Sequence, residues 1–299
     1  MSVKTKRVIL ALFLSVFLIF STAILAHAYS SILAFGDSLS DNGIYGQYSD
    51  AVNISTADIY GFGRFSNGPV WVEYLAGPTL LNVPLLDLAY GGATTAYDNP
   101  AAYQATGNPW FQSATGLQWQ VAAYQSFYGT IAPTDLVTLW AGGNDMFNSR
   151  SPVLAATNIG LAIQNLINIG GREFIVPNLS YTDTDPYKPW KQPFDTNLSL
   201  VLASLIGANP GVDIYELDMN GFVPTGIDFF TGTFLAQTYG PGTYAWWDTV
   251  GVHPTTEIHT QIADYAAAAS EVPEPSTMLL VGSGLIGLAG YGRKKFFKR

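Results

Sequence analysis

Five short apolar runs, each bounded by glycine or polar residues, constrain the fold of this 299-residue chain most strongly. They predict buried strands and cover residues 32–35, 85–89, 135–140, 173–176 and 212–215. Helical patterns lie between or after them, over residues 117–128, 151–169, 195–206 and 255–269. Strands that alternate with helices pair in parallel through right-handed crossovers. We therefore predict an α/β fold, a three-layer α/β/α sandwich with a central parallel sheet of about five strands.

Three glycine-bearing stretches without apolar periodicity predict irregular structure. They cover residues 42–58, 98–113 and 221–247, and each contains tyrosine or tryptophan. Because loops at a strand edge often carry binding residues, the first stretch is a candidate for the mouth of a substrate pocket.

Both ends of the chain differ from its middle. Lys4, Lys6 and Arg7 precede an apolar run at residues 8–25 and a small-residue site at 26–28. This pattern predicts a secretory signal peptide over residues 1–28, with a retained membrane helix as the alternative. At the other end, Pro-Glu-Pro at 273–275 is followed by an apolar run at 278–289 and a basic cluster at 293–299. The remaining domain spans residues 29–271.

The C-terminal segment, residues 272–299, resembles the PEP-CTERM sorting signal of Gram-negative bacteria that produce exopolysaccharide. The resemblance rests on the Pro-Glu-Pro motif, the glycine-containing hydrophobic helix and the basic end. It implies an exosortase partner, transient anchoring by a transmembrane helix, loss of the tail, and delivery to the cell surface or extracellular matrix. The chain is then exported across the inner membrane.

Charge indicates which partners are not expected, and cysteine content indicates how the exported domain is stabilised. Residues 29–272 contain five basic and 21 acidic side chains, a net charge of −16. This charge repels phosphate backbones, so a nucleic-acid partner is not expected. The chain has no cysteine, so disulfide bonds cannot stabilise the exported domain and burial of apolar surface must do so.

Ser38 follows the first predicted strand, in the sequence Gly36-Asp37-Ser38. Reactive groups of open α/β sheets gather at the carboxyl ends of the strands, so this serine is a candidate nucleophile. A serine needs a base, and histidine is the usual one because its pKa lies near neutrality. His253 lies in a loop before the last helix and is the better candidate, whereas His259 is expected on the surface of that helix. Asp248 is the nearest upstream carboxylate that could orient His253.

Three groups at successive strand ends are candidate oxyanion donors. They are the backbone amides of Ser38 and Gly92 and the side-chain amide of Asn144. Donors fixed in advance stabilise the negative charge that develops in acyl transfer. Each has a simpler interpretation as a turn residue, but all three are expected at one edge of the sheet.

Four motifs in order resemble the blocks of the GDSL (SGNH) hydrolases, in the branch of lipase-like esterases and lecithinase-like hemolysins. They are Gly-Asp-Ser-Leu at 36–39, Gly-Gly-Ala-Thr at 91–94, Gly-Gly-Asn-Asp at 142–145 and His-Pro-Thr at 253–255. The resemblance implies a flavodoxin-like SGNH fold, with Ser38 as nucleophile and His253 as base. It also implies Ser38, Gly92 and Asn144 as oxyanion donors, and no metal or cofactor.

One departure from the family pattern concerns the acid. The family usually places it three residues before the histidine, where this chain has Val250. Asp248 lies five residues before His253 and remains the candidate, because a glycine-containing loop can bring the two side chains together. A Ser38–His253 dyad assisted by a backbone carbonyl is the alternative.

The sequence therefore predicts an exported serine esterase or lipase that acts on carboxylic esters through an acyl-enzyme. The substrate is expected to be an acyl ester or lipid, or alternatively an O-acetyl group on exopolysaccharide. A non-catalytic matrix or adhesion protein on the same fold is the hypothesis from another class, and the displaced acid is its motivation.

Overall fold

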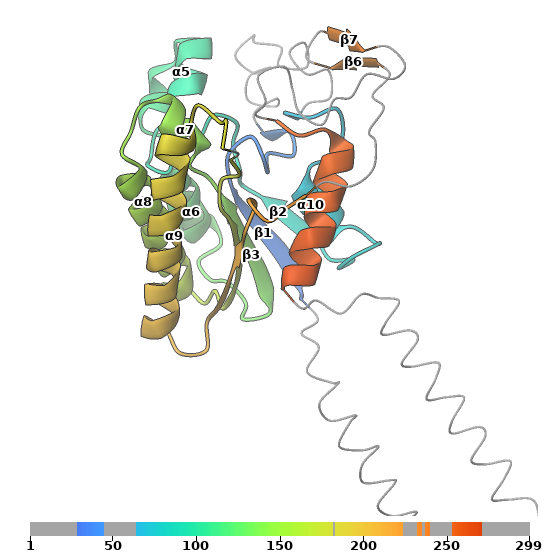
Figure 1. The fold of residues 1–299 in the computed structure, drawn as a ribbon. Helices are drawn as coiled ribbons and strands as arrows, with labels where there is room; N and C mark the ends of the chain where they lie inside the picture. The colour runs from blue at the N-terminus through green and yellow to red at the C-terminus, as the bar shows by residue number, and fades with distance from the viewer. Residues whose placement is uncertain are drawn as a thin grey trace, which may run out of the picture. The chain divides into compact units, whose positions relative to one another are not determined.

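The central sheet has five parallel strands in the computed structural model, which describes residues 29–44, 64–181, 183–223 and 253–270. Backbone is also described for two short strands at 232–234 and 237–239. The sheet order is β2-β1-β3-β4-β5 (Figure 1). This α/β arrangement confirms the predicted fold class, and the order is that of flavodoxin-like sheets. The strands are β1 (Ser31–Gly36), β2 (Leu85–Asp87), β3 (Asp135–Trp140), β4 (Glu173–Pro177) and β5 (Asp213–Leu217).

The strand order changes direction at β1. The chain moves from β1 outward to β2, then returns to the other side of β1 to form β3. Gly36 at the end of β1 pairs with Trp140 at the end of β3. Ligands of open α/β sheets bind beside such a reversal, outside the carboxyl ends of the strands. The topology thus places Ser38 and Asn144, which follow these two strands, at the same edge.

Helices cover both faces of the sheet, which makes three layers. In Figure 1, α6 (Leu117–Phe127), α8 (Pro152–Asn168) and α9 (Lys188–Ala208) lie together on one side and α10 (Thr256–Ala269) lies on the other. The short helix α4 (Trp71–Ala76) packs against α10.

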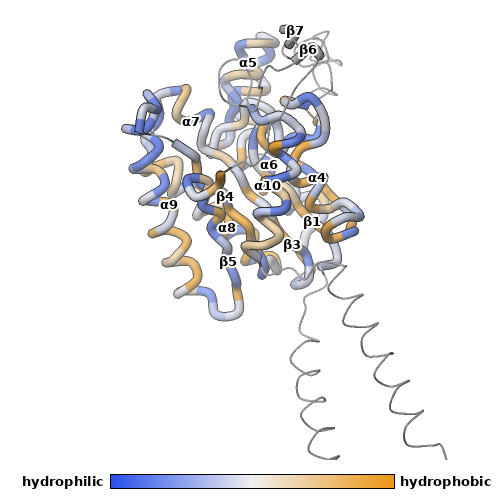
Figure 2. The backbone as a smooth tube through the Cα atoms, turned by 45° about the vertical axis from the view of Figure 1, so that its right-hand side comes forward, coloured by the Kyte–Doolittle hydropathy of each residue, from blue (hydrophilic) through white to orange (hydrophobic). Residues whose placement is uncertain are grey.

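Side-chain alternation along β1 divides the interior. Leu33 and Phe35 belong to the core cluster shared with α6, α8 and α9, while Ile32 and Ala34 are fully buried outside that cluster. Every side chain of β1 after Ser31 is thus buried, as expected for a strand covered on both faces. The hydrophobic colouring of the sheet strands in Figure 2 follows this burial.

Two stretches predicted as irregular contain regular structure. Residues 98–113 form α5 (Pro100–Thr106) and the 3₁₀ helix η1 (Pro109–Gln112). The side chains of Asn99 and Asn108 cap these two helices by accepting hydrogen bonds from the backbone N–H groups of Ala102 and Trp110. The prediction was wrong here because side-chain caps stabilise elements too short to show periodicity.

Residues 232–234 and 237–239 also depart from the prediction, because they form the antiparallel strands β6 (Gly232–Phe234) and β7 (Gln237–Tyr239). Helix α9 begins at Lys188, seven residues before the expected start, although Pro193 lies inside it. A proline in a helix removes one backbone hydrogen bond, which is why the pattern indicated a later start.

No helix within the described ranges is long and apolar enough to cross a membrane. The predicted signal peptide, the C-terminal segment and most of the 42–58 stretch lie outside those ranges.

Candidate active site

The turn after β1 fixes Ser38. Gly36 has φ +143°, and a Cβ there would overlap the backbone carbonyl of Trp140 on β3, so only glycine fits. Gln120 on α6 holds the peptide groups around Gly36 from both sides. Its Oε1 accepts from the N–H of Gly36 at 2.9 Å, and its Nε2 donates to the carbonyl of Gly36 at 2.7 Å. The backbone before Ser38 is therefore fixed both by the close approach to Trp140 and by the two hydrogen bonds to Gln120. The Ser38 residue is 7% exposed.

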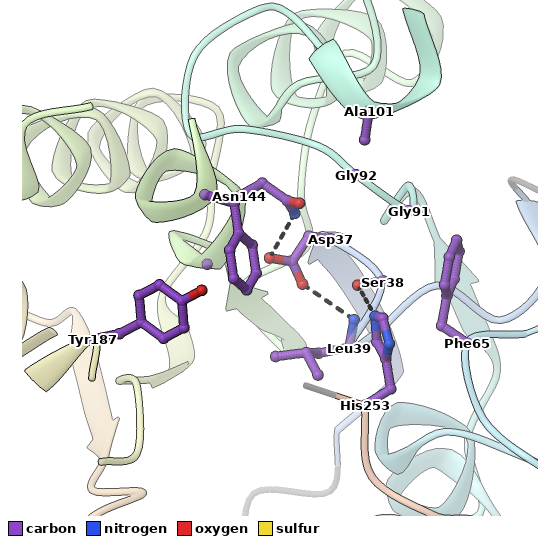
Figure 3. A pocket seen from close by; sticks show the side chains of 12 residues that line it. Asp37, Ser38, Leu39, Phe65, Gly91, Gly92, Ala101, Asn144, Tyr187 and His253 are labelled. Carbon is purple, nitrogen blue, oxygen red and sulfur yellow. Dashed lines mark hydrogen bonds between the residues drawn. The ribbon is translucent and has the colours of Figure 1, made fainter. Parts of the chain in front are cut away.

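His253 lies next to Ser38, although 215 positions separate them in the sequence. Its Nε2 lies 2.8 Å from Ser38 Oγ, and the two side chains point toward one another in Figure 3. His253 precedes α10 by three residues, so the packing of α10 on the sheet carries the imidazole to the end of β1. This geometry is that of a hydroxyl beside a general base.

The three predicted oxyanion donors line one pocket with His253. The pocket has a volume of about 440 Å³, and Ser38, Gly92 and Asn144 lie on its wall. Gly92 has φ +82°, which lets the backbone turn beside Asn99 and Ala101. The Nδ2 of Asn144 donates to the carbonyl of Ala93 at 3.0 Å, which links the turn after β3 to the turn after β2.

Asp37 lies under the pocket between these groups. Its Oδ1 accepts from the N–H of Leu39 at 3.1 Å, and its Oδ2 accepts from Nδ2 of Asn144 at 3.4 Å. Burial raises the pKa of Asp37 to about 7, and the neighbouring carboxyl of Asp145 adds to the effect. A carboxyl with this pKa is largely neutral below pH 7, which limits the negative charge beside Asn144.

Asp41 and Asp87 were missed by sequence reasoning. Asp41 is fully buried, and its carboxylate accepts backbone N–H groups of Gly43 (2.9 Å), Ile44 (2.7 Å) and Gly91 (2.7 Å). Asp87 accepts from the N–H of Asn42 at 3.0 Å and of Ala89 at 2.8 Å. The two carboxyls thus connect the turns after β1 and β2, next to Gly92.

A further buried acid, Asp145, connects the turns after β2 and β3. Asp145 accepts from the backbone N–H and the hydroxyl of Thr95, each at 2.8 Å. Burial raises the pKa of Asp145 above its ordinary value. Asp145 follows Asn144 on the short helix α7 (Gly143–Phe147), which the sequence did not predict as a helix. The sequence signals for Asp145 were its place after a strand and in the Gly-Gly-Asn-Asp motif, but neither predicted its contact with Thr95.

His259 is not on the helix surface, and that expectation was wrong. Its side chain is fully buried, because the face of α10 that carries it packs against α4. The backbone N–H of Trp71 donates to Nδ1 of His259 at 3.2 Å. Burial, with a smaller contribution from His253, lowers the pKa of His259 to about 3, so its ring is neutral.

Asp248 and Val250 lie outside the described residues, so the acid of the triad stays a prediction. Within the described ranges, no group of histidine, aspartate and glutamate side chains is arranged to hold a metal ion.

A family model described as GDSL-like lipase/acylhydrolase matches residues 32–266. The chain belongs to this family. A second model, described as the PEP-CTERM protein-sorting motif, matches residues 271–294. The GDSL match runs from the second residue of β1 into α10, so the candidate site lies within it.

Curated relatives of this GDSL chain include a phosphatidylcholine-sterol acyltransferase from Aeromonas hydrophila, 32% identical over 165 residues. That alignment covers 53% of this chain and 47% of the relative. A thermolabile hemolysin from Vibrio parahaemolyticus is 30% identical over 164 residues, which cover 50% of this chain and 34% of the relative. The aligned part thus spans less than half the length of both relatives.

Among solved structures, the chain is similar to a lipolytic protein of the G-D-S-L family from Veillonella parvula. The two share 17% identity with a TM-score of 0.44, and the match covers 80% of this chain and 96% of the other.

Proposed function

We propose that this chain is a serine hydrolase of carboxylic esters, with Ser38 as nucleophile and His253 as general base. The observation that carries the proposal is the 2.8 Å separation of His253 Nε2 and Ser38 Oγ inside a pocket also lined by Gly92 and Asn144. Membership of the GDSL-like lipase/acylhydrolase family supports acyl chemistry.

The first half of the reaction forms the acyl-enzyme. Oγ of Ser38 attacks the ester carbonyl carbon while Nε2 of His253 takes the hydroxyl proton. The resulting tetrahedral intermediate breaks its bond to the alkoxy oxygen, which leaves as an alcohol with the proton from His253. In the second half His253 takes a proton from water, whose oxygen attacks the acyl carbon. The second tetrahedral intermediate then breaks its bond to Oγ of Ser38, which takes the proton from His253 as the carboxylic acid leaves.

The oxyanion of each intermediate binds the amides of Ser38 and Gly92 and Nδ2 of Asn144. Preorganised donors of this kind contribute about 3–4 kcal/mol each in well-studied hydrolases. The pKa of Asp37 is raised to about 7 by its burial, so below pH 7 the carboxyl is largely neutral and opposes the developing negative charge less than a carboxylate would.

Asp248 is our candidate for the acid that orients His253. A dyad with a backbone carbonyl in that place is the alternative. Loss of the orienting group slows such enzymes strongly without abolishing activity. Asp248→Asn therefore separates the two arrangements by the size of its effect on kcat.

The substrate we propose is an ester with an apolar acyl group. Leu39, Phe65, Ala101, Phe147 and Tyr187 line the pocket beside the polar groups. An apolar wall with a few placed polar groups suits such a ligand. One relative is named as an acyltransferase, so an alcohol could replace water as the acyl acceptor.

An O-acetyl group on exopolysaccharide is the second candidate substrate. The PEP-CTERM match favours a protein sorted to an extracellular setting, and Phe147 and Tyr187 are half exposed at the pocket. Turnover of an acetylated polysaccharide against C8 to C16 acyl esters separates the two candidates.

Substitution of the nucleophile tests the proposed function directly. Ser38→Ala should reduce hydrolysis of a short-chain nitrophenyl ester by at least about 10³-fold, because it removes the hydroxyl that lies 2.8 Å from His253 Nε2. Circular dichroism and thermal unfolding should match the unsubstituted protein. A fluorophosphonate probe should label the unsubstituted protein at Ser38 and fail to label the variant.

Undiminished hydrolysis by Ser38→Ala would contradict the assignment. Absence of labelling in the unsubstituted protein would favour a matrix or adhesion role on the same fold.

We also propose that the mature protein, residues 29–271, acts outside the inner membrane after export and exosortase processing. The PEP-CTERM match supports sorting of this kind.

A further inference from the structure

A five-residue segment, residues 65–69, contacts residues 253–256, the segment that carries His253, through four of its five residues. The hydroxyl of Ser66 donates to the carbonyl of Pro254 at 2.9 Å, and this pair is buried. Oδ1 of Asn67 accepts from the N–H of Thr256 at 2.7 Å, and Oγ1 of Thr256 donates to the carbonyl of Pro69 at 2.8 Å. We call residues 65–69 the clamp segment.

The ring of Phe65 extends the clamp segment onto the imidazole itself. The centroids of the Phe65 and His253 rings are 5.2 Å apart with an interplanar angle of 34°. This is within the usual range for paired aromatic rings. Phe65 also lies against Gly91, where a Cβ would overlap the phenyl ring. Figure 3 shows Phe65 beside His253 at the wall of the pocket.

The clamp segment is itself held in place. Arg64 donates from Nε to Oε2 of Glu73 at 2.7 Å and from Nη2 to Oε1 at 2.5 Å. Oε2 of Glu73 also accepts from the N–H of Val70, at the start of α4. Trp71 on α4 donates its backbone N–H to His259 on α10. Helix α4 thus holds the segment that carries Phe65, and its contact with α10 holds the segment that carries His253.

We propose that Phe65 is a positioning residue that holds the imidazole of His253 at Ser38. The inference rests on the proposed function. A histidine side chain rotates about two bonds, and proton transfer requires Nε2 within hydrogen-bond reach of Oγ. The hydrogen bonds of Ser66 and Asn67 fix the backbone on the C-terminal side of His253, and the Phe65 ring fixes the plane of the imidazole.

A matched pair of variants tests the ring. Phe65→Leu keeps an apolar side chain but removes the aromatic face, whereas Phe65→Tyr keeps it. We expect Phe65→Leu to lower kcat on a nitrophenyl ester on the order of 10- to 100-fold, because small misplacements of reacting groups cost this much. KM should stay within about twofold, and Phe65→Tyr should recover most of kcat. Phe127→Leu, at an exposed ring on α6, serves as control.

Comparison of the effects on kcat and on KM distinguishes a positioning role of Phe65 from a substrate-binding role. Phe65 also lines the pocket, so a purely substrate-binding role would raise KM and leave kcat unchanged. That outcome, or unchanged kinetics in Phe65→Leu, would overturn the positioning role.

Crystal structures of both variants decide the inference without reference to activity. In Phe65→Tyr the separation of His253 Nε2 and Ser38 Oγ should stay near 2.8 Å, and in Phe65→Leu the hydrogen bond should be lost. A retained hydrogen bond in Phe65→Leu would overturn the inference. If the unsubstituted protein hydrolyses no ester, the proposed function fails separately, and these distances still test the positioning of His253.

Discussion

Asp37 shows how one residue of the nucleophile turn is constrained by its surroundings. It comes directly before Ser38, is almost completely buried, and lies within hydrogen-bond reach of Asn144. Its pKa is raised to about 7, mainly because burial disfavours the carboxylate and partly because Asp145 and Asp41 are close. Two hydrogen bonds, from Leu39 and Asn144, favour the charged form but do not offset burial. The fold therefore prefers a protonated Asp37.

This preference makes stability depend on pH. An unfolded chain releases the Asp37 proton near pH 4, whereas the folded chain keeps it until about pH 7. The contribution to stability is complete below pH 4 and is lost as the pH rises through 7. Asparagine does not ionise, so Asp37→Asn should gain unfolding free energy relative to the unsubstituted protein as the pH rises. The gain between pH 4 and pH 8 is on the order of 4 kcal/mol.

Urea unfolding of both proteins at pH 4, 6 and 8 measures this difference. Asp183→Asn, at an exposed ion pair with Lys188, is the matched control and should show no such trend. A difference between Asp37→Asn and the unsubstituted protein that is constant across this range would contradict the raised pKa.

The residues of the candidate site differ in how far the sequence could place them. Ser38, Gly92 and Asn144 each follow an apolar run, and the carboxyl ends of parallel strands meet at one edge, so their proximity could be predicted. Asp41 could not be placed, because its burial depends on Gly91, a residue 50 positions later in the chain. His259 was misplaced because the helical pattern alone does not show that α4 covers that face of α10.

At the scale of the elements, α8 and α9 pack closely against each other at Gly160. Gly160 lies in α8, and a Cβ at this position would overlap Cγ1 of Val201 on α9. Both helices cover the same face of the sheet. The distance between them therefore affects the packing of the core cluster, which includes Phe174 and Ile163. The absence of a side chain at Gly160 lets the two helices approach.

Two glycine-to-alanine substitutions test this contact. Gly160→Ala should lower the free energy of unfolding by about 1–3 kcal/mol, because the added methyl group forces the helices apart. Gly207→Ala, in α9 with open space around it, should raise that free energy by about 0.5–1 kcal/mol, because alanine favours the helix. Denaturant unfolding of both variants measures the two effects. Equal effects of the same sign would show that the α8–α9 contact tolerates a methyl group.

The elements that the sequence missed are all short. Strands β1, β3 and β4 could be predicted because their apolar runs are bounded by turn residues, and α8 because its serine cap and periodicity agree. Helix α7 has five residues and η1 four, fewer than two helical turns. Such elements depend on caps and neighbouring segments rather than on their own periodicity.

At the scale of the whole molecule, the two family matches divide the chain into two segments of different charge. The GDSL match ends at residue 266, and the PEP-CTERM match begins at residue 271. Residues 29–272 carry a net charge of −16, whereas residues 293–299 contain five basic side chains. Basic residues behind an apolar run favour the cytoplasmic side of a membrane. The charge pattern thus suits an exported acidic domain with a tail retained at the inner membrane until processing.

Substitution of Pro273, Glu274 and Pro275 by alanine tests this division. In a Gram-negative host that contains an exosortase, the unsubstituted protein should lose its tail and appear in the cell-surface fraction. The triple variant should keep its full C-terminus and stay in the membrane fraction, because the motif that the processing enzyme recognises is gone while the apolar run and basic end remain. Mass spectrometry of the C-terminal peptide and fractionation measure both effects. A chain that ends at residue 271 is the control for the processed form, and purified variants should hydrolyse esters equally, because the substitutions lie outside the GDSL match. Identical processing of the triple variant and the unsubstituted protein would show that the Pro-Glu-Pro motif does not direct sorting of this chain.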